Sequence, residues 1–259
     1  MPNILELHNV SRSFSHGIFR THTIQAVHQV SFSLEHGKTF GLVGNSGCGK
    51  TTLSRLITRL LPLTSGHILF EGEDIAHLDG KKAKAYHRAV QMIFQNPEAS
   101  LDPSMHIRDS LLEALSIHQI GSTREERMDK ILQTLGLVGL SEALLSRYPH
   151  QISGGEAQRL VICRALLLEP KVLLLDEPTA MLDVSVQASI MNLLKALQQE
   201  LGLTYLYITH DIELLSWISD TIGVMQQGQL VELGSRAQII ESPDHPYTKT
   251  LLDSYTHWK

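Results

Sequence analysis

Cysteine is scarce in this sequence, and long apolar runs are missing from it. Cys48 and Cys163 are the two cysteines among 259 residues; they are too few for a disulfide framework and indicate a reducing compartment. No stretch approaches the roughly 18 uninterrupted apolar residues of a membrane-spanning helix. Residues 4–10 alternate apolar and polar side chains and are unlike a secretory leader. We therefore expect a soluble cytoplasmic protein, which a partner would have to hold at a membrane.

Positive charge is also in short supply. The 22 lysines and arginines against 27 aspartates and glutamates leave a formal net charge of −5, which argues against a surface that coats nucleic acid. The 14 histidines are scattered without paired ligand spacing, so we expect solvated side chains rather than a transition-metal site. Internal repeats and low-complexity segments are absent too. The length suits one large domain or two small ones.

What the sequence does contain is a glycine-rich loop between an apolar strand and an apolar-spaced helix. It fits G-x-x-x-x-G-K-[ST] at every fixed position, and we call it the phosphate loop. Its residues are Gly44, Asn45, Ser46, Gly47, Cys48, Gly49, Lys50, Thr51 and Thr52. Glycines let backbone N–H groups converge on an anion at a helix N-terminus. Lys50 can reach terminal phosphates and Thr51 can ligate Mg²⁺, so we expect a nucleoside triphosphate here.

The surrounding segments predict a mixed α/β protein. Residues 3–43 read as an antiparallel β-subdomain, with a polar loop that holds Phe14 and Phe19. Either ring could stack on an adenine or simply pack under the loop. Residues 104–146 predict an inserted helical subdomain. Further expected elements are a basic helix at 81–88, a helix at about 185–200, a hairpin at 227–228 and a polar tail.

Two continuous apolar strands end in residues suited to phosphate chemistry. Asp176 and Glu177 follow the first strand, and His210 follows the second. Asp176 can hold Mg²⁺, while Glu177 could polarise a water for in-line attack on the γ-phosphate. His210 could bind the γ-phosphate or that water. We expect them at one sheet edge; the alternatives are a strand-ending turn and a structural histidine.

A second anion site is indicated at Ser153-Gly154-Gly155, which we call the Ser-Gly-Gly segment. It combines a hydroxyl, two glycines and a helix N-terminus. Because the chain already has a phosphate loop, a second such site needs its own explanation. Either it caps a helix, or it serves a nucleotide held by another subunit.

The order of these motifs resembles the ATP-binding cassette (ABC) ATPases over nearly the whole chain. The motifs are the phosphate loop, Gln95, 152–156, 172–177, 180–183 and His210. The resemblance implies a nucleotide-binding domain over 1–259: an α/β P-loop NTPase core, an N-terminal antiparallel β-subdomain and an α-helical subdomain at about 104–160. It also implies a head-to-tail dimer, with two ATP molecules between the phosphate loop of one subunit and the Ser-Gly-Gly segment of the other.

The same resemblance assigns roles to single residues. Gln95 would ligate Mg²⁺ and couple to a transmembrane partner, Asp183 would communicate across the dimer, and Phe14 would stack on the adenine. Ile152 stands where the family has leucine, and Glu156 where it has glutamine. Ile152 keeps the bulk, whereas Glu156 places a carboxylate near phosphates, at a helix start from which it can point outward. We expect activity to survive both departures.

Other segments resemble the peptide and nickel importer group: 94–103, 228–234 and 243–249. Longer relatives continue into an extension with cysteines, whereas this chain stops at Lys259. The short end, with His16 and His22, is more like the second ATPase of nickel or metallophore importers.

The leading hypothesis is the ATP-hydrolysing subunit of a bacterial ABC importer, peripheral on the cytoplasmic face of the membrane. It would use ATP and Mg²⁺ and work with a related ATPase as a heterodimer, two permeases and an extracytoplasmic solute-binding protein. The cargo would be a nickel or metal chelate, or a di- or oligopeptide. One rival is a soluble cassette ATPase acting on nucleic acid or ribosomes, which the acidic charge and the lack of a coiled coil disfavour. Another is an inert regulatory subunit, which Glu177 and His210 disfavour. We also expect Cys48 to be a small space-filler whose alkylation abolishes ATP binding, and ATP to protect it.

Overall fold

The computed structural model of the chain describes residues 2–16 and 22–256. The chain divides into two compact units. The first unit combines Met1–Ala83 with Thr204–Lys259, and the second unit is Lys84–Leu203. Among the described residues, no helix is long and apolar enough to cross a membrane.

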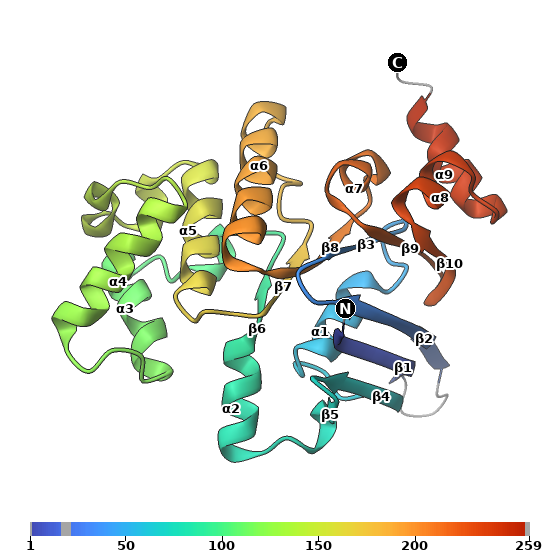
Figure 1. Ribbon diagram of the computed structural model, residues 1–259, viewed down its shortest axis with the longest axis horizontal. Helices are drawn as coiled ribbons and strands as arrows, with labels where there is room; N and C mark the ends of the chain where they lie inside the picture. Colours follow the sequence, from blue (N-terminus) through green and yellow to red (C-terminus); the bar gives the residue numbers. More distant parts are fainter. Residues whose placement is uncertain (1, 17–21, 257–259) are drawn as a thin grey trace. The chain divides into compact units, whose positions relative to one another are not determined.

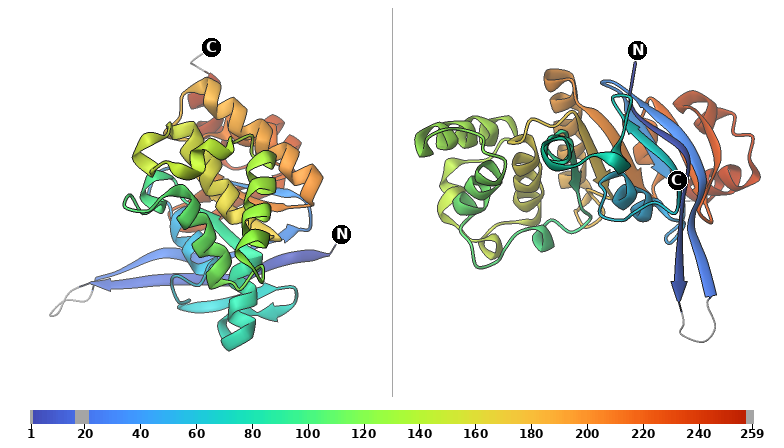
Figure 2. Two further views of the ribbon diagram at one scale, coloured as in Figure 1. Left: turned by 90° about the vertical axis from the view of Figure 1, so that its left-hand side faces the viewer. Right: turned by 90° about the horizontal axis from the view of Figure 1, so that it is seen from below.

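An antiparallel sheet in the order β2-β1-β4-β5 lies in the first unit (Figure 1). Its strands are β1 (Asn3–His16), β2 (His22–Glu35), β4 (Ser65–Phe70) and β5 (Glu73–Asp74). β1 and β2 form a long ribbon that continues past β4 (Figure 2). Phe14 pairs with Ile24 inside this ribbon, so its expected place in a polar loop is wrong. Phe19 and the side chains of His16 and His22 lie outside the described part.

Parallel strands form the core of the first unit. β3 (Thr39–Val43) pairs in parallel with β8 (Thr204–Thr209) and with β9 (Thr221–Gln226). Every residue of β3 and β8 is buried, as continuous apolar runs predict. β10 (Gln229–Ser235) returns antiparallel to β9 through the turn at Gln227 and Gly228, which confirms the predicted hairpin.

Helices complete the first unit. They are α1 (Lys50–Ile57), η1 (Ile75–His77), α7 (Ile212–Ile218), α8 (Arg236–Glu241) and α9 (Pro246–Thr256). α8 and α9 lie in the segment that the sequence indicates as a polar tail. Leu251 and Thr248 of α9 are buried, so an apolar face, too short for a clear periodic signal, packs against the unit. α2 (Gly80–Ala89) contains the boundary between the units.

The second unit is built around β6 (Val90–Ile93) and β7 (Val172–Asp176), which pair in parallel. Its helices are η2 (Glu98–Ser100), α3 (Ile107–Ile117), α4 (Arg124–Leu137), η3 (Glu142–Ser146), η4 (Pro149–Gln151), α5 (Gly154–Leu166) and α6 (Val184–Leu201). Leu111 and Leu115 of α3 are buried, as are Ile131 and Leu135 of α4. This spacing confirms the predicted helices.

Candidate functional site

The phosphate loop joins β3 to α1 in a turn that requires glycine. A Cβ atom on Gly44 would lie 2.1 Å from the Met225 carbonyl oxygen. Gly49, with φ +107°, would place a Cβ 2.2 Å from the carbonyl oxygen of Ala26. Neither position admits a side chain without moving backbone. The loop is therefore pressed against two other segments of the first unit, while its tip (residues 45–47) stays exposed.

Lys50 is folded back into the phosphate loop. Its Nζ donates to the carbonyl oxygens of Gly44 at 2.6 Å and Asn45 at 3.1 Å. The Cys48 Sγ lies 3.7 Å from the same nitrogen, and both side chains are buried. A buried ammonium must be hydrogen-bonded, and here the loop's own carbonyls satisfy it. An incoming phosphate would replace those carbonyls with charged acceptors, which bind ammonium more strongly.

Phe14 and His210 are also in the first unit. The ring of Phe14 is half-buried, and the Arg12 guanidinium carbon lies 4.7 Å from its centroid, a cation–π contact. His210 directly follows β8 and is exposed. Asp211 then caps α7 by accepting N–H groups of Glu213 and Leu214. Adenine stacking by Phe14 and phosphate contact by His210 stay predictions.

The second unit brings together Gln95 and Glu177, which the sequence assigned to different tasks. The Gln95 Nε2 donates to the Glu177 Oε2 at 3.1 Å. Asp176 is the last residue of β7 and is buried. Glu177 has φ 48°, a left-handed conformation that is uncommon outside glycine and clusters at functional sites. The turn after β7 thus aims a carboxylate at the exposed amide of Gln95.

The Ser-Gly-Gly segment begins α5 with a capping box. The Ser153 Oγ accepts the Glu156 N–H at 3.3 Å, and the Glu156 Oε2 accepts from the Ser153 backbone N–H and Oγ at 2.8 Å each. These bonds, the backbone one first, lower the pKa of Glu156. The carboxylate therefore does not point outward. Its sequence signal was present, because S-x-x-E before an apolar run is the capping-box pattern.

The start of α6 lies beside this segment. A Cβ on Gly155 would come within 2.8 Å of the Val186 Cγ1, so glycine permits the close approach. Asp183 caps α6 by accepting the N–H groups of Ser185 and Val186 at 3.0 Å each. The Ser185 hydroxyl first, and then these N–H groups, lower the pKa of Asp183. A hollow of about 800 Å³ is lined by residues of both helix starts.

Large apolar side chains flank Asp183. Met181 is 66% exposed and Val184 is 82% exposed.

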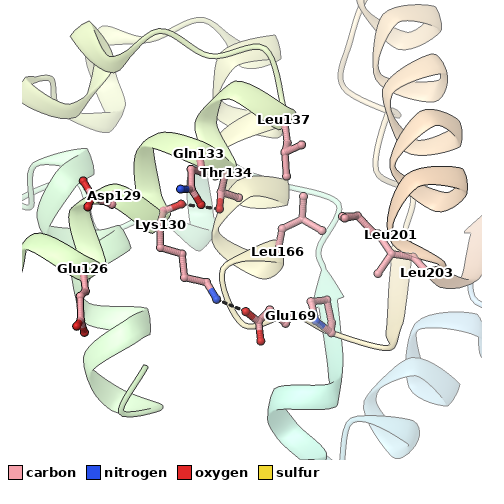
Figure 3. A pocket seen from close by; sticks show the side chains of 11 residues that line it. Glu126, Asp129, Lys130, Gln133, Thr134, Leu137, Leu166, Glu169, Leu201 and Leu203 are labelled. Atoms are coloured by element: carbon pink, nitrogen blue, oxygen red, sulfur yellow. Dashed lines mark hydrogen bonds and ion pairs between the residues drawn. The ribbon is translucent and has the colours of Figure 1, made fainter. Parts of the chain in front are cut away.

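A different pocket in the second unit contains none of the predicted site residues (Figure 3). It measures about 590 Å³ and lies between leucines and an ion pair of Lys130 with Glu169. Glu169 also pairs with Arg88 at 2.6 Å. Within residues 2–16 and 22–256, this pocket included, no group of three or more His, Cys, Asp or Glu is arranged to hold a metal.

Sequence comparisons decide the family. The pattern of the ABC transporter family matches residues 27–180. This chain belongs to the ABC transporter family. A second pattern, the C-terminal region of oligopeptide/dipeptide transporters, matches residues 231–259 of this ABC protein. ABC ATPases hydrolyse ATP to power transport, so the predictions of ATP binding and of an ATPase are confirmed.

Named relatives and solved structures agree with this assignment. The oligopeptide transport ATP-binding protein OppF of Streptococcus mutans is 45% identical over 251 residues, which are 97% of this chain and 81% of that protein. The dipeptide transport ATP-binding protein DppF of Lactococcus lactis is 44% identical over 253 residues, or 97% and 80%.

Two solved structures carry the same fold. A dimeric post-hydrolysis state of the cassette MJ0796 with ADP and Pi shares 28% identity at a TM-score of 0.79, over 90% of this chain and 98% of that one. CbiO1 of Clostridium perfringens shares 27% identity at a TM-score of 0.81, over 100% and 99%. These matches confirm the predicted ABC nucleotide-binding fold.

Proposed function

We propose that this ABC ATPase hydrolyses ATP to energise the import of di- or oligopeptides. The cargo is supported by the relatives OppF and DppF, which are named for peptides, and by the peptide-transporter pattern at residues 231–259. A nickel or metal-chelate cargo, expected from the short end of the chain and from His16 and His22, finds no support among these relatives. Neither does a soluble ATPase acting on nucleic acid or ribosomes.

ATP would be held first by the phosphate loop. Lys50 would leave the carbonyls of Gly44 and Asn45 and bind the terminal phosphates, at little desolvation cost because it is already buried. Ser46 and Gly47, at the exposed tip of the loop, would bind the phosphate oxygens through their backbone N–H groups. The ring of Phe14 would stack on the adenine.

The residue types proposed to hold Mg²⁺ suit this ion. Thr51, Gln95 and Asp176 offer a hydroxyl, an amide and a carboxylate oxygen, the hard ligands that this ion takes beside phosphates. When bound, Mg²⁺ neutralises charge on the phosphates. All three assignments are proposals, with Thr51 in the first unit and the other two in the second.

Glu177 is the proposed general base. Its carboxylate would accept a proton from the water that attacks the γ-phosphorus, while the bond to the β-phosphate oxygen breaks. The Gln95 Nε2 donates to the Glu177 Oε2 at 3.1 Å, which orients the carboxylate. His210 would bind the γ-phosphate or the same water through a ring nitrogen. The Gln95–Glu177 contact is the observation that carries this proposal.

The proposed assembly is a heterodimer with a related ATPase, two permeases and an extracytoplasmic solute-binding protein, at the cytoplasmic face of the membrane. Residues 1–259 would act as one nucleotide-binding domain, with its helical subdomain at about 104–160. Exposed Met181 and Val184 beside Asp183 support a partner subunit on that surface. The Ser-Gly-Gly segment would meet the partner's nucleotide.

Glu177→Gln tests the catalytic assignment. Loss of a general base costs about 10²- to 10⁴-fold, so ATPase turnover should fall by at least about 100-fold while MgATP still binds. Turnover at the unmutated rate would remove Glu177 from the mechanism.

Transport assays in proteoliposomes that contain this ATPase and its co-purified permease subunits test the cargo. ATP-dependent uptake of labelled peptides, without uptake of ⁶³Ni²⁺, is expected. Nickel uptake, or ATPase stimulation by RNA in the absence of permeases, would contradict the proposed function.

A further inference from the structure

The start of α9 reaches the phosphate loop from the far end of the sequence. The Tyr247 Oη accepts the backbone N–H of Asn45 at 3.0 Å, across 202 positions of the chain. Tyr247 is half-buried, and burial raises the pKa of its phenol. The hydroxyl is therefore neutral at physiological pH. It accepts one hydrogen bond from the loop and retains its own proton for donation.

A carboxylate of β10 fixes the turn that carries Tyr247. The Glu232 Oε1 accepts the Asp244 N–H at 2.7 Å, and its Oε2 accepts the His245 N–H at 3.2 Å. The Tyr247 N–H then donates to the His245 Nδ1 at 3.2 Å. Charge-assisted bonds of this kind are stronger than neutral ones and hold geometry well. The position of the phenol relative to the phosphate loop is thus set by β10 rather than by α9 alone.

The peptide groups that flank Asn45 are held from several sides. The Asn45 carbonyl accepts the Lys50 Nζ at 3.1 Å and the Cys48 N–H at 3.2 Å. When Lys50 turns toward phosphate, that carbonyl loses the ammonium. The bond from the Asn45 N–H to the Tyr247 Oη does not involve Lys50, so turning the lysine toward phosphate does not require that bond to break.

A second contact supports the loop from the same C-terminal region. The Gly228 N–H, in the turn between β9 and β10, donates to the Cys48 carbonyl at 2.9 Å. Tyr247 and Gly228 therefore hold the entry and the middle of the loop. Neither uses the N–H groups of Ser46 or Gly47, which stay at the exposed tip. Loss of one support would leave a loop that must be ordered when phosphate arrives, and that ordering weakens binding.

We propose that Tyr247 is a positioning residue for nucleotide binding, which holds the Asn45 peptide so that the tip of the phosphate loop is preorganised for the triphosphate. The proposal rests on the proposed function only in that the loop binds ATP. It gives the segment 243–249, which served above as a mark of the importer group, a physical task in the ATPase itself.

Tyr247→Phe is the direct test, because it removes the hydroxyl and keeps the ring. In the purified full chain we expect the Kd for a fluorescent ATP analogue, and the KM for ATP, to rise by about 3- to 10-fold. The kcat should stay within about 2-fold, since the phenol does not touch the reacting atoms. The thermal midpoint should move by less than about 2 °C.

Thr250→Val is the matched control on the same helix. The Thr250 hydroxyl is exposed and donates only within α9, to the Pro246 carbonyl at 3.0 Å. Its removal should leave Kd, KM and kcat unchanged. If Kd rises equally in both variants, the loss of affinity comes from a less stable α9 and not from the Tyr247 hydroxyl, and the inference is overturned.

Glu232→Gln is a second, independent test of the proposal. The amide keeps one acceptor oxygen but loses the charge and the second acceptor, so the turn at 244–245 loosens. Glu232→Gln alone should raise Kd by about 2- to 5-fold, and it should add little to Tyr247→Phe, because both act through one contact. Full additivity would contradict a shared route.

The two proposals fail in different ways. If the unmutated chain binds no ATP, the proposed function fails. If it binds ATP and Tyr247→Phe binds equally well, only the role of Tyr247 fails.

Discussion

The phosphate loop and the Ser-Gly-Gly segment are both glycine-containing helix N-termini, yet they are built in opposite ways. The phosphate loop is pressed on Met225 and Ala26, and its cation Lys50 is buried. The Ser-Gly-Gly segment is largely exposed, and its hydroxyl is bound to a carboxylate of its own helix. One is an anion site prepared by its own unit. The other carries a negative charge where an anion would have to come.

The difference determines which of the two sites can bind phosphate without a partner subunit. A buried ammonium and several convergent N–H groups can bind phosphate without further help. At Ser153, the Glu156 carboxylate already accepts the hydroxyl and one N–H, so an incoming phosphate must compete with it. We infer that the Ser-Gly-Gly segment contributes when a nucleotide is already held elsewhere, as in the proposed dimer.

The largest expected effect contrasts the two cysteines. Cys48 lies in the phosphate loop, whereas Cys163 lies in α5, where burial raises the pKa of its thiol to about 12. Both thiols are buried, but Cys48 is 7% exposed and Cys163 is 0% exposed, so a maleimide should modify Cys48 before Cys163. Modification should abolish ATP binding, and bound ATP should protect. Mass spectrometry gives the labelled site, with Cys48→Ser as the control. If Cys48 is modified and ATP turnover stays intact, the thiol does not lie where the phosphates bind.

Next in size is the contrast between Lys50→Ala and Ser153→Ala. Loss of the ammonium should weaken ATP binding by at least about 30-fold, since charge-assisted bonds to phosphate are strong. Loss of the serine hydroxyl should change the ATP affinity of the isolated chain by less than about 2-fold. Titration with a fluorescent ATP analogue measures both. Equal losses would show that the two segments serve one nucleotide within a single chain.

Replacing a glycine by alanine should affect the free energy of unfolding differently at the two sites. Gly49→Ala should lower the free energy of unfolding by about 2–4 kcal/mol, because the left-handed backbone and the Ala26 carbonyl both oppose a Cβ. In Gly154→Ala the new Cβ meets only the Leu182 Cδ2, at an ordinary 3.5 Å, so the change should stay within about 1 kcal/mol. Urea denaturation compares the two. A similar loss of unfolding free energy in Gly49→Ala and Gly154→Ala would contradict the difference in packing around the two glycines.

The smallest effect concerns Glu156 and pH. Its pKa is lowered in the folded chain, so its carboxylate stabilises the fold above the unfolded value of about 4.3, and that gain disappears as pH falls through the folded pKa. Glu156→Gln should be destabilised by less than about 1 kcal/mol at pH 7, since solvent screens the site. The difference should vanish once the pH falls below the lowered pKa of Glu156. Urea denaturation midpoints of both proteins at several pH values measure this difference in stability. If the difference grows as the pH falls, the contribution of the Glu156 carboxylate has the opposite sign.

Local pattern predicted the parts of the site that depend on neighbouring residues. The strand before Gly44, the helix after Lys50 and the carboxylates after β7 all follow from short-range periodicity and glycine placement. The pairing of Gln95 with Glu177 was not foreseen, although both were singled out. Their contact depends on the parallel register of β6 and β7, which sets where two distant strand ends lie.

Contacts between distant segments escaped prediction for the same reason. Nothing near Asn45 indicates Tyr247, because their contact joins positions 202 apart. Phe14 was assigned to a loop since its neighbours are polar, yet the β1–β2 ribbon continues through it. Pairing with β2 outweighed local polarity there. The sequence contains the capping-box pattern of Ser153 and Glu156, but the same carboxylate also fits the place of a neighbour of phosphate, and only the structure shows it as a cap.

The positive φ of Glu177 has a consequence for how this chain tolerates change. Glycine adopts φ 48° without steric cost, whereas glutamate in that conformation loses about 1 kcal/mol or more. A chain with glycine at 177 would therefore fold at least as well while lacking the proposed base. At position 177 the local backbone therefore favours glycine, whereas the proposed catalytic role requires a carboxylate.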